Sequence, residues 1–123
     1  MFKTLKRALT HHIQTMDHNF MCLDLSLSPT DDLYIRRLET LGMSIDRLRF
    51  TLEGLPISHE LIERVVLHNI RTQVTTISTN IQLLHLKYKV SPTELIYLET
   101  ILTECQGFTE ALENTKALAT AMI

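Results

Sequence analysis

Apolar residues recur along this chain at spacings of three and four positions, which is the period of an α-helix that buries one stripe of its surface. Four such stripes follow one another. They comprise Phe2, Leu5, Leu9, Ile13, Met16, Phe20 and Leu23; Tyr34, Leu38, Leu41, Ile45, Leu48 and Leu52; Ile62, Val66, Ile70, Val74, Ile77, Ile81, Leu84 and Tyr88; and Leu98, Ile101, Cys105, Phe108, Leu112, Thr115, Leu118 and Met122. The remaining positions are largely polar. The pattern predicts four amphipathic helices whose stripes face a common core.

Clusters of turn-forming residues separate the stripes. In the last cluster Ser91 is suited to cap the following helix, with a proline at the first helical position and Glu94 completing a capping box. Residues 28–31 repeat this arrangement between the first two stripes. In the middle cluster Gly54 suits the position after a helix, and Ser58 is suited to cap the next helix.

The predicted helices cover residues 2–24, 30–53, 59–88 and 92–121. Because their connections are short, consecutive helices are expected to be antiparallel neighbours. We therefore predict an all-α fold, an antiparallel up-down-up-down four-helix bundle, formed by a single domain over residues 1–123. The last two helices are the longest, and a homodimer is expected to cover the protruding end of their hairpin. The pattern leaves open whether the central bundle is formed within one chain or by hairpins of two chains.

Composition narrows the possible partners. The chain has 123 residues, of which 45% are hydrophobic and 21% charged, and its formal net charge is −2. This balance gives no electrostatic reason to expect nucleic acid or an anionic membrane as a partner. Neither a leader segment nor a transmembrane span is predicted, so the protein is expected to be cytoplasmic.

The sulfur-containing residues give no indication of a reactive site. Cys22 and Cys105 fall within helical stripes or beside them and form no CxxC motif, so both are expected to be free, buried thiols. Met16, Met21 and Met43 are expected to fill the core.

The third helix carries an unusual polar side. If Val66 marks the centre of its apolar stripe, His68 lies about 200° away, close to the opposite face. Arg64, Arg71, Thr72, Thr75, Thr79 and Gln82 share this outer side. A solvated helix more often carries Glu, Lys and Gln, because the branched threonine side chain loses rotamer freedom in a helix. Small hydroxyl residues instead leave a low surface against which another helix can pack.

A histidine exposed on such a surface is a nucleophile near neutral pH. It can accept a phosphoryl group and later pass it to another acceptor, which divides one transfer into two steps. Phosphoryl transfer needs positioning and charge neutralisation more than covalent assistance, and Arg71 lies one turn from His68 on the same side. The alternative interpretation is that His68 is an ordinary solvated histidine.

Residues 68–84 read His-Asn-Ile-Arg-Thr-Gln-Val-Thr-Thr-Ile-Ser-Thr-Asn-Ile-Gln-Leu-Leu. This run resembles the phosphoacceptor box of two-component sensor histidine kinases, and the segment 58–121 resembles their dimerisation and histidine phosphotransfer domain. That resemblance implies a helical hairpin with His68 as the outward acceptor, an aliphatic Ile70, and a basic Arg71. It also implies that Thr72 orients water for dephosphorylation of a receiver domain.

Two positions depart from the family pattern. Asn69 replaces the acidic residue that serves the family as general base, and Gln73 replaces a proline that bends the helix. The chain also shows no glycine-rich nucleotide box, so it is not expected to be an ATP-dependent kinase by itself.

The resemblance therefore implies a phosphorelay protein that accepts and donates phosphate between response-regulator receiver domains through His68. Arg71 and Thr72 would act beside it, and Arg64, Asn69, Thr75 and Thr79 would form the docking surface. No cofactor is expected, because the receiver would carry the Mg²⁺. The alternatives are a non-catalytic adaptor or inhibitor that docks onto a histidine kinase or response regulator, and a plain helical interaction protein.

The first helix contains a weak echo of this box. His11-His12-Ile13-Gln14-Thr15 resembles residues 68–72, and Ser-Pro-Thr follows in both halves of the chain. An ancestral hairpin duplication would explain the echo, as would chance similarity between helices of one composition. His11 and His18 lie two turns apart, roughly 10 Å, and cannot share a metal without an intervening ligand. No metal site is therefore predicted.

Overall fold

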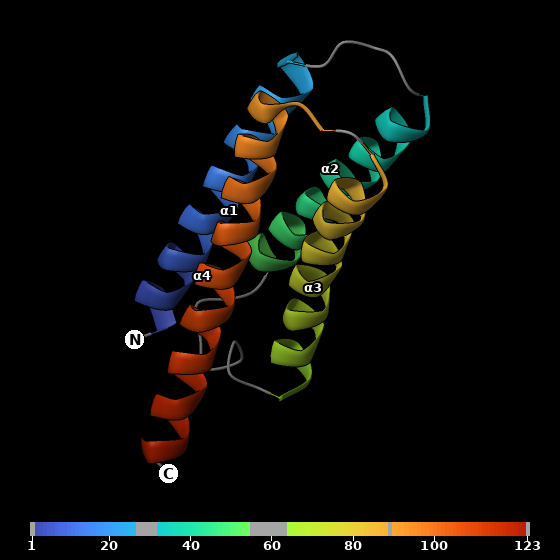
Figure 1. The fold of residues 1–123 in the computed structure, drawn as a ribbon. Coiled ribbons are helices and arrows are strands. Elements are labelled where there is room, and N and C mark those ends of the chain that lie inside the picture. The colour runs from blue at the N-terminus through green and yellow to red at the C-terminus, as the bar shows by residue number, and fades with distance from the viewer. Residues whose placement is uncertain (1, 27–31, 55–63, 89, 123) are drawn as a thin grey trace.

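The computed structural model describes residues 2–26, 32–54, 64–88 and 90–122, and these residues form four helices without a strand. The helices are α1 (Phe2–Ser26), α2 (Asp32–Glu53), α3 (Arg64–Lys87) and α4 (Pro92–Met122) (Figure 1). The predicted all-α class is confirmed. The helix ends agree closely with the prediction, except that the predicted starts of the second and third helices, residues 30–31 and 59–63, lie outside the described residues.

The core confirms the four predicted stripes. Among the described side chains, five buried ones from each helix form one hydrophobic cluster, and every one of them lies on a predicted stripe. Phe20, Tyr34 and Tyr88, which also lie on the stripes, are half-buried and pack against this cluster. The stripe positions at 2, 62, 66, 115, 118 and 122 lie outside the side chains that the structure describes.

Ser91 caps α4 as predicted, while the Glu94 side chain of the predicted capping box bonds to α2. Ser91 Oγ accepts a hydrogen bond from the Glu94 amide at 3.2 Å, and the Ser91 carbonyl accepts one from the Leu95 amide at 2.9 Å. The Glu94 carboxylate in turn accepts a hydrogen bond of 2.6 Å from the Tyr34 hydroxyl of α2. Burial, together with this carboxylate, raises the pKa of Tyr34. The cap of α4 therefore also joins α4 to α2.

Of the other predicted helix caps, only the one at Gly54 lies among the described residues. The expected caps at residues 28–31 and at Ser58 lie outside the described residues. Gly54 directly follows α2 as predicted, and its amide donates to the Phe50 carbonyl at 3.1 Å. Its φ is not positive, so α2 ends without the left-handed residue that glycine often supplies there.

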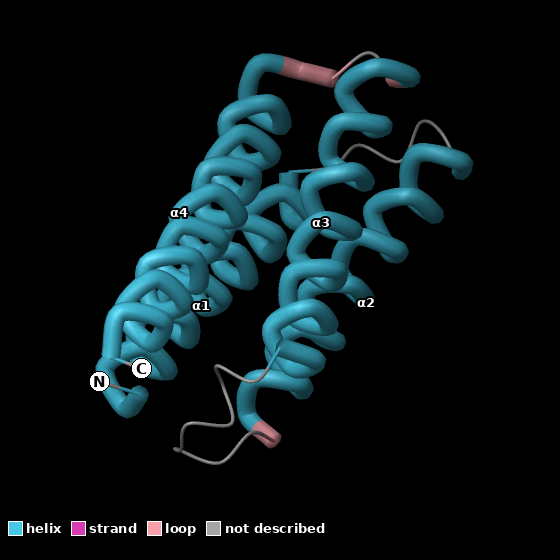
Figure 2. Tube along the Cα trace, turned by 90° about the horizontal axis from the view of Figure 1, so that it is seen from below, coloured by secondary structure: helices cyan, strands magenta, loops and turns pink. Residues whose placement is uncertain are grey.

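The helices pack in a closed ring. The most extensive packing joins α1 to α4, followed by α2 to α3, and the remaining neighbours are α3–α4 and α1–α2. Figures 1 and 2 show α1 beside α4 and α2 beside α3, with the two chain ends at one end of the molecule. The core is thus formed within one chain. Over the described residues, no helix combines the length and hydropathy needed to cross a bilayer.

Two glycines inside helices allow close contacts that the apolar pattern does not foresee. A Cβ at Gly107 of α4 would lie 2.7 Å from Cε1 of His12 on α1, and one at Gly42 of α2 would lie 2.6 Å from the Phe20 ring. A glycine within a helical pattern is the sequence signal for such an approach. At Gly107 it lets the His12 ring lie directly against the backbone of α4.

Three sulfur-containing residues differ from the prediction. Cys105 is buried, but Cys22 is only half-buried, with its Sγ 3.7 Å from Nε2 of His18. Met16 lies in the core as expected, whereas Met21 and Met43 are 61% and 66% exposed. Both exposed methionines lie one position after a residue that faces a neighbouring helix, so the helical period turns them outward.

We predict that Gly107→Ala destabilises the fold by about 1 kcal/mol, measured by urea unfolding. Overpacking against the His12 ring costs about 1–3 kcal/mol, which exceeds the roughly 1 kcal/mol that alanine gains over glycine within a helix. Gly54→Ala is the control, because the nearest atom to its Cβ would be 3.4 Å away. A Gly107→Ala variant more stable than the parent would contradict the close packing of α1 on α4.

The two thiols should differ sharply in reactivity. Burial raises the pKa of the Cys105 thiol to about 11, although a hydrogen bond with Ser78 opposes the rise. Because the thiolate is the reactive form, one thiol per chain should react with iodoacetamide at pH 8, and Cys22→Ser should abolish that reaction. Cys105 should react only in denaturant. Rapid labelling of Cys105 in the native protein, located by peptide mass spectrometry, would contradict its burial.

Candidate functional site

The outer side of α3 carries the residues that the sequence singled out. His68, Asn69, Thr72, Thr75 and Thr79 are all exposed. On the opposite side of the same helix, Ile70, Val74 and Ile77 are at most 2% exposed. The burial of this stripe fixes the rotation of α3 about its axis, and His68 therefore faces solvent as predicted.

Seven side chains of α3 surround a shallow depression with a volume of about 350 Å³. Its lining consists of His68, Arg71, Thr72, Thr75, Thr76, Thr79 and Asn80, all on α3. The short threonine side chains form a low floor along the helix, and His68 and Arg71 lie at its N-terminal end. The predicted low threonine surface is thus present beside the predicted acceptor.

The threonine hydroxyls of this depression are partly engaged by the helix itself. Thr72 Oγ1 donates to the His68 carbonyl at 2.9 Å, and Thr76 Oγ1 donates to the Thr72 carbonyl at 3.0 Å. These i to i−4 bonds occupy the hydroxyl protons and leave the methyl groups and oxygen lone pairs for a partner. Donors for an anion held here would come from Arg71, from the partner, or from the hydroxyls of Thr75 and Thr79, which also line the depression.

Arg71 does not point freely into the depression. Its guanidinium forms an ion pair with the Glu113 carboxylate of α4, and its Nε is buried without a hydrogen-bond partner among the described atoms. The two side chains are 41% and 48% exposed, so solvent screens the pair. Arg71 thus lines the depression while it contacts α4, and a phosphoryl group on His68 would compete with Glu113 for the guanidinium.

Five of the predicted residues, His68, Arg71, Thr72, Thr75 and Thr79, line the depression together, whereas Asn69 is exposed on α3 outside its lining. The side chain of Arg64 lies outside the described residues, although α3 begins there. Sequence reasoning missed Thr76 and Asn80, each of which follows another lining residue by one helical turn and was detectable from that period. It also missed Glu113, because no local pattern connects α3 to a residue on α4.

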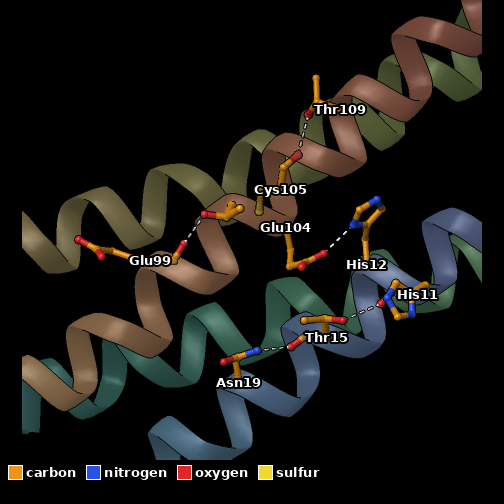
Figure 3. Close-up of polar contacts among 9 residues, drawn as sticks. His11, His12, Thr15, Asn19, Glu99, Glu104, Cys105 and Thr109 are labelled. Carbon is orange, nitrogen blue, oxygen red and sulfur yellow. Dashed lines mark hydrogen bonds and ion pairs between the residues drawn. The ribbon is translucent and has the colours of Figure 1, made fainter.

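A second polar contact lies where α1 packs on α4. His12 Nδ1 is 2.5 Å from Glu104 Oε2, and the two side chains are 25% and 21% exposed (Figure 3). The His12 ring also meets the Phe108 ring edge-on, with centroids 6.5 Å apart. Its neighbour His11 remains exposed. Nowhere in the described part of the chain do three His, Cys, Asp or Glu side chains gather closely enough to hold a metal.

A third polar contact joins α1 to α2. Arg49 of α2 bonds to Asp17 of α1 through one guanidinium nitrogen and to Asp46 through the other, both at 2.8 Å. Burial raises the pKa of Asp17, and the attraction of Arg49 offsets part of that rise. The positive charge of Arg49 is therefore committed to two carboxylates.

Comparison of this chain with family models, with curated proteins and with solved structures finds no match. The resemblance of residues 68–84 to a phosphoacceptor box therefore has no support from a relative. Any functional conclusion has to be argued from the geometry of α3 and its neighbours.

The ion pair of Arg71 with Glu113 should contribute little to stability. For a pair this exposed we expect a coupling free energy below about 1 kcal/mol in a double-mutant cycle of Arg71→Gln and Glu113→Gln, measured by urea unfolding. Increasing salt should reduce it further. A coupling of several kcal/mol would show that the pair is a structural requirement and that Arg71 is unable to leave Glu113 for a ligand.

Proposed function

We propose that this chain is a histidine phosphotransfer protein of a two-component phosphorelay, with His68 as its phosphoacceptor. His68 would receive a phosphoryl group from the aspartate of one receiver domain and donate it to the aspartate of another. The observation that supports this proposal most directly is the exposure of His68 at one end of the threonine-lined depression. Such a protein would act in the cytoplasm.

The transfer needs little chemistry from this chain. A ring nitrogen of His68 attacks phosphorus, the bond from phosphorus to the aspartyl oxygen breaks, and the imidazole releases its proton to solvent. The receiver regains a free carboxylate. Mg²⁺ carried by the receiver would neutralise charge on the phosphoryl oxygens, and Arg71 would add a second positive charge after exchanging Glu113 for phosphate.

The threonine surface supports docking of a receiver. Its small side chains permit a helix of the partner to approach the α3 backbone closely, as small residues do wherever helices pack tightly. Asn69, Thr75 and Thr79 would contact that helix, and Arg64 would extend the contact toward the start of α3. The engaged hydroxyl of Thr72 is held in position beside His68 by its bond to the His68 carbonyl, at 2.9 Å.

We further infer that the bundle has the up-down-up-down order of the resembled family. Consecutive helices are in contact, and both chain ends lie at one end of the molecule (Figure 1). Because the core is formed within one chain, phosphotransfer would not require a second copy. The homodimer stays a prediction, with the C-terminal end of α4 as the surface it would cover.

The contact between Arg71 and Glu113 favours a second candidate function. In the observed arrangement Arg71 is paired and Asn69 replaces an acidic residue, so the same surface suits a non-catalytic adaptor or inhibitor. Such a protein would occupy the docking surface of a receiver or a histidine kinase without becoming phosphorylated.

A transfer assay distinguishes the two functions. Purified receiver domains charged with acetyl phosphate are incubated with the chain, and phosphohistidine is located by peptide mass spectrometry at neutral pH. We expect label on His68, and its loss at that position in His68→Gln. His85→Gln is the matched control, because His85 is also exposed on α3 but lies outside the depression.

Binding of receivers without transfer would support the adaptor and contradict the phosphotransfer proposal. Absence of both binding and transfer across the receiver panel would contradict both functions and leave a helical interaction protein. Equal effects of His68→Gln and His85→Gln would show that the depression has no special part in the transfer.

A further inference from the structure

The two halves of the chain repeat one another more closely than the histidine box alone indicates. Around the two exposed histidines the same four residues recur at the same spacings. They read Arg7-x-x-x-His11-x-Ile13-x-Thr15 and Arg64-x-x-x-His68-x-Ile70-x-Thr72. A repeat of this length also places the same chemical groups on α1 and α3, one turn apart in each case.

The structure gives the repeated residues equivalent surroundings. His11 and His68 are both exposed, while Ile13 and Ile70 are 2% and 0% exposed. The Thr15 hydroxyl donates to the His11 carbonyl at 3.1 Å, as the Thr72 hydroxyl does to the His68 carbonyl at 2.9 Å. The chain of polar contacts from His11 through Thr15 is visible along α1 in Figure 3.

The second helix of each half extends the correspondence. Residues 63 positions apart match in α2 and α4: Leu33 and Ile96 are each 62% exposed, and Leu38 and Ile101 are 3% and 0% exposed. Thr40 and Thr103 also match. The hydroxyl of each donates to the carbonyl four residues earlier, at 3.1 Å for Thr40 and 3.0 Å for Thr103. The match is partial, because Leu41 is fully buried, whereas Glu104, which lies 63 positions later, is 21% exposed.

The packing of the helices agrees with a duplicated hairpin. Exchange of α1 with α3 and of α2 with α4 maps the α1–α4 contact onto α3–α2, and these are the two most extensive contacts in the bundle. It likewise maps α1–α2 onto α3–α4, the two lesser contacts. This pattern of contacts agrees with a pseudo-twofold arrangement, in which the outer side of α1 would correspond to the outer side of α3.

From this juxtaposition we propose that His11 is a second phosphoacceptor, so that each half of the bundle presents one histidine to a receiver domain. The inference rests on the phosphotransfer function proposed for His68. The step is the same: a ring nitrogen of His11 bonds to phosphorus, the bond to the aspartyl oxygen of the receiver breaks, and the imidazole proton passes to solvent. One chain would then carry two phosphoryl groups.

The two sites are not equal in charge. Arg7 is exposed one turn before His11, as the repeat requires, but Gln14 stands at the position of Arg71. Gln14 lines a crevice between α1 and α2 that also holds Arg49, whose guanidinium is bonded to Asp17 and Asp46. Because His11 lacks one cation, its phosphorylation should be about ten- to a hundredfold slower than that of His68, the value of one charge-assisted hydrogen bond.

The test uses the whole chain and the receiver domains charged with acetyl phosphate. Phosphoryl groups per chain are counted by intact mass, sites are assigned by peptide mass spectrometry, and helicity of each variant is checked by circular dichroism. We expect wild-type protein to reach two groups, His68→Gln to retain slow labelling at His11, and the double variant His11→Gln/His68→Gln to lose labelling. His18→Gln, an exposed histidine on the same helix, is the matched control and should have no effect.

A gain-of-function variant makes the result independent of folding defects. Gln14→Arg in the His68→Gln background restores the missing cation and should speed labelling of His11 by about tenfold or more. Labelling of His68 in the wild type, with none at His11 in either His68→Gln or the Gln14→Arg variant, would overturn the second acceptor and leave the proposed function intact. No labelling of any variant, wild type included, would refute the proposed function and this inference together.

Discussion

Burial of four apolar stripes in one core is the constraint on which the other features depend. In the described part of the chain each helix contributes five buried side chains, and full burial of one such side chain is worth about 1.5–3 kcal/mol. Rotation of any helix by one residue position would expose most of its stripe, so the rotational setting of each helix is fixed. The outward direction of His68 is a consequence of that setting, because Ile70 and Val74 are held in the core.

The polar contacts between helices contribute less free energy but select which helices meet. Four of these contacts each join two different helices: His12 with Glu104, Tyr34 with Glu94, Arg49 with Asp17, and Arg71 with Glu113. Solvent reaches all of these pairs, so each is expected to be worth about a kcal/mol or less. Their effect is on specificity: an alternative arrangement of equally apolar helices would leave several partly buried carboxylates without partners. The close approach at Gly107 acts in the same direction, since the absence of a side chain there lets the His12 ring lie against α4.

The exposed side of α3, which the burial of its apolar stripe turns toward solvent, supports the proposed function. Threonines that bond back to the helix backbone form a low surface on α3, and one histidine and one arginine lie at its end. Arg71 is paired with the Glu113 carboxylate in the structure. In the proposed function it would exchange this carboxylate for a phosphoryl group on His68. The internal repeat adds a second exposed histidine with the same local hydrogen bond. A bundle built from two related hairpins thus offers two comparable faces, and only the α3 face has an arginine three residues after its histidine.

The sequence by itself determined the features that depend on helical period. The four helices, the Ser91 cap, all twenty described core positions and the exposure of His68 could be read from spacing, because a 3.6-residue period places side chains without reference to the rest of the molecule. Tertiary structure alone decided that α1 packs most extensively on α4, that Glu113 holds Arg71, and that Cys22 stays half-buried. These features depend on which faces of distant segments meet and on the rotamers chosen there. Spacing along one helix carries no information about either.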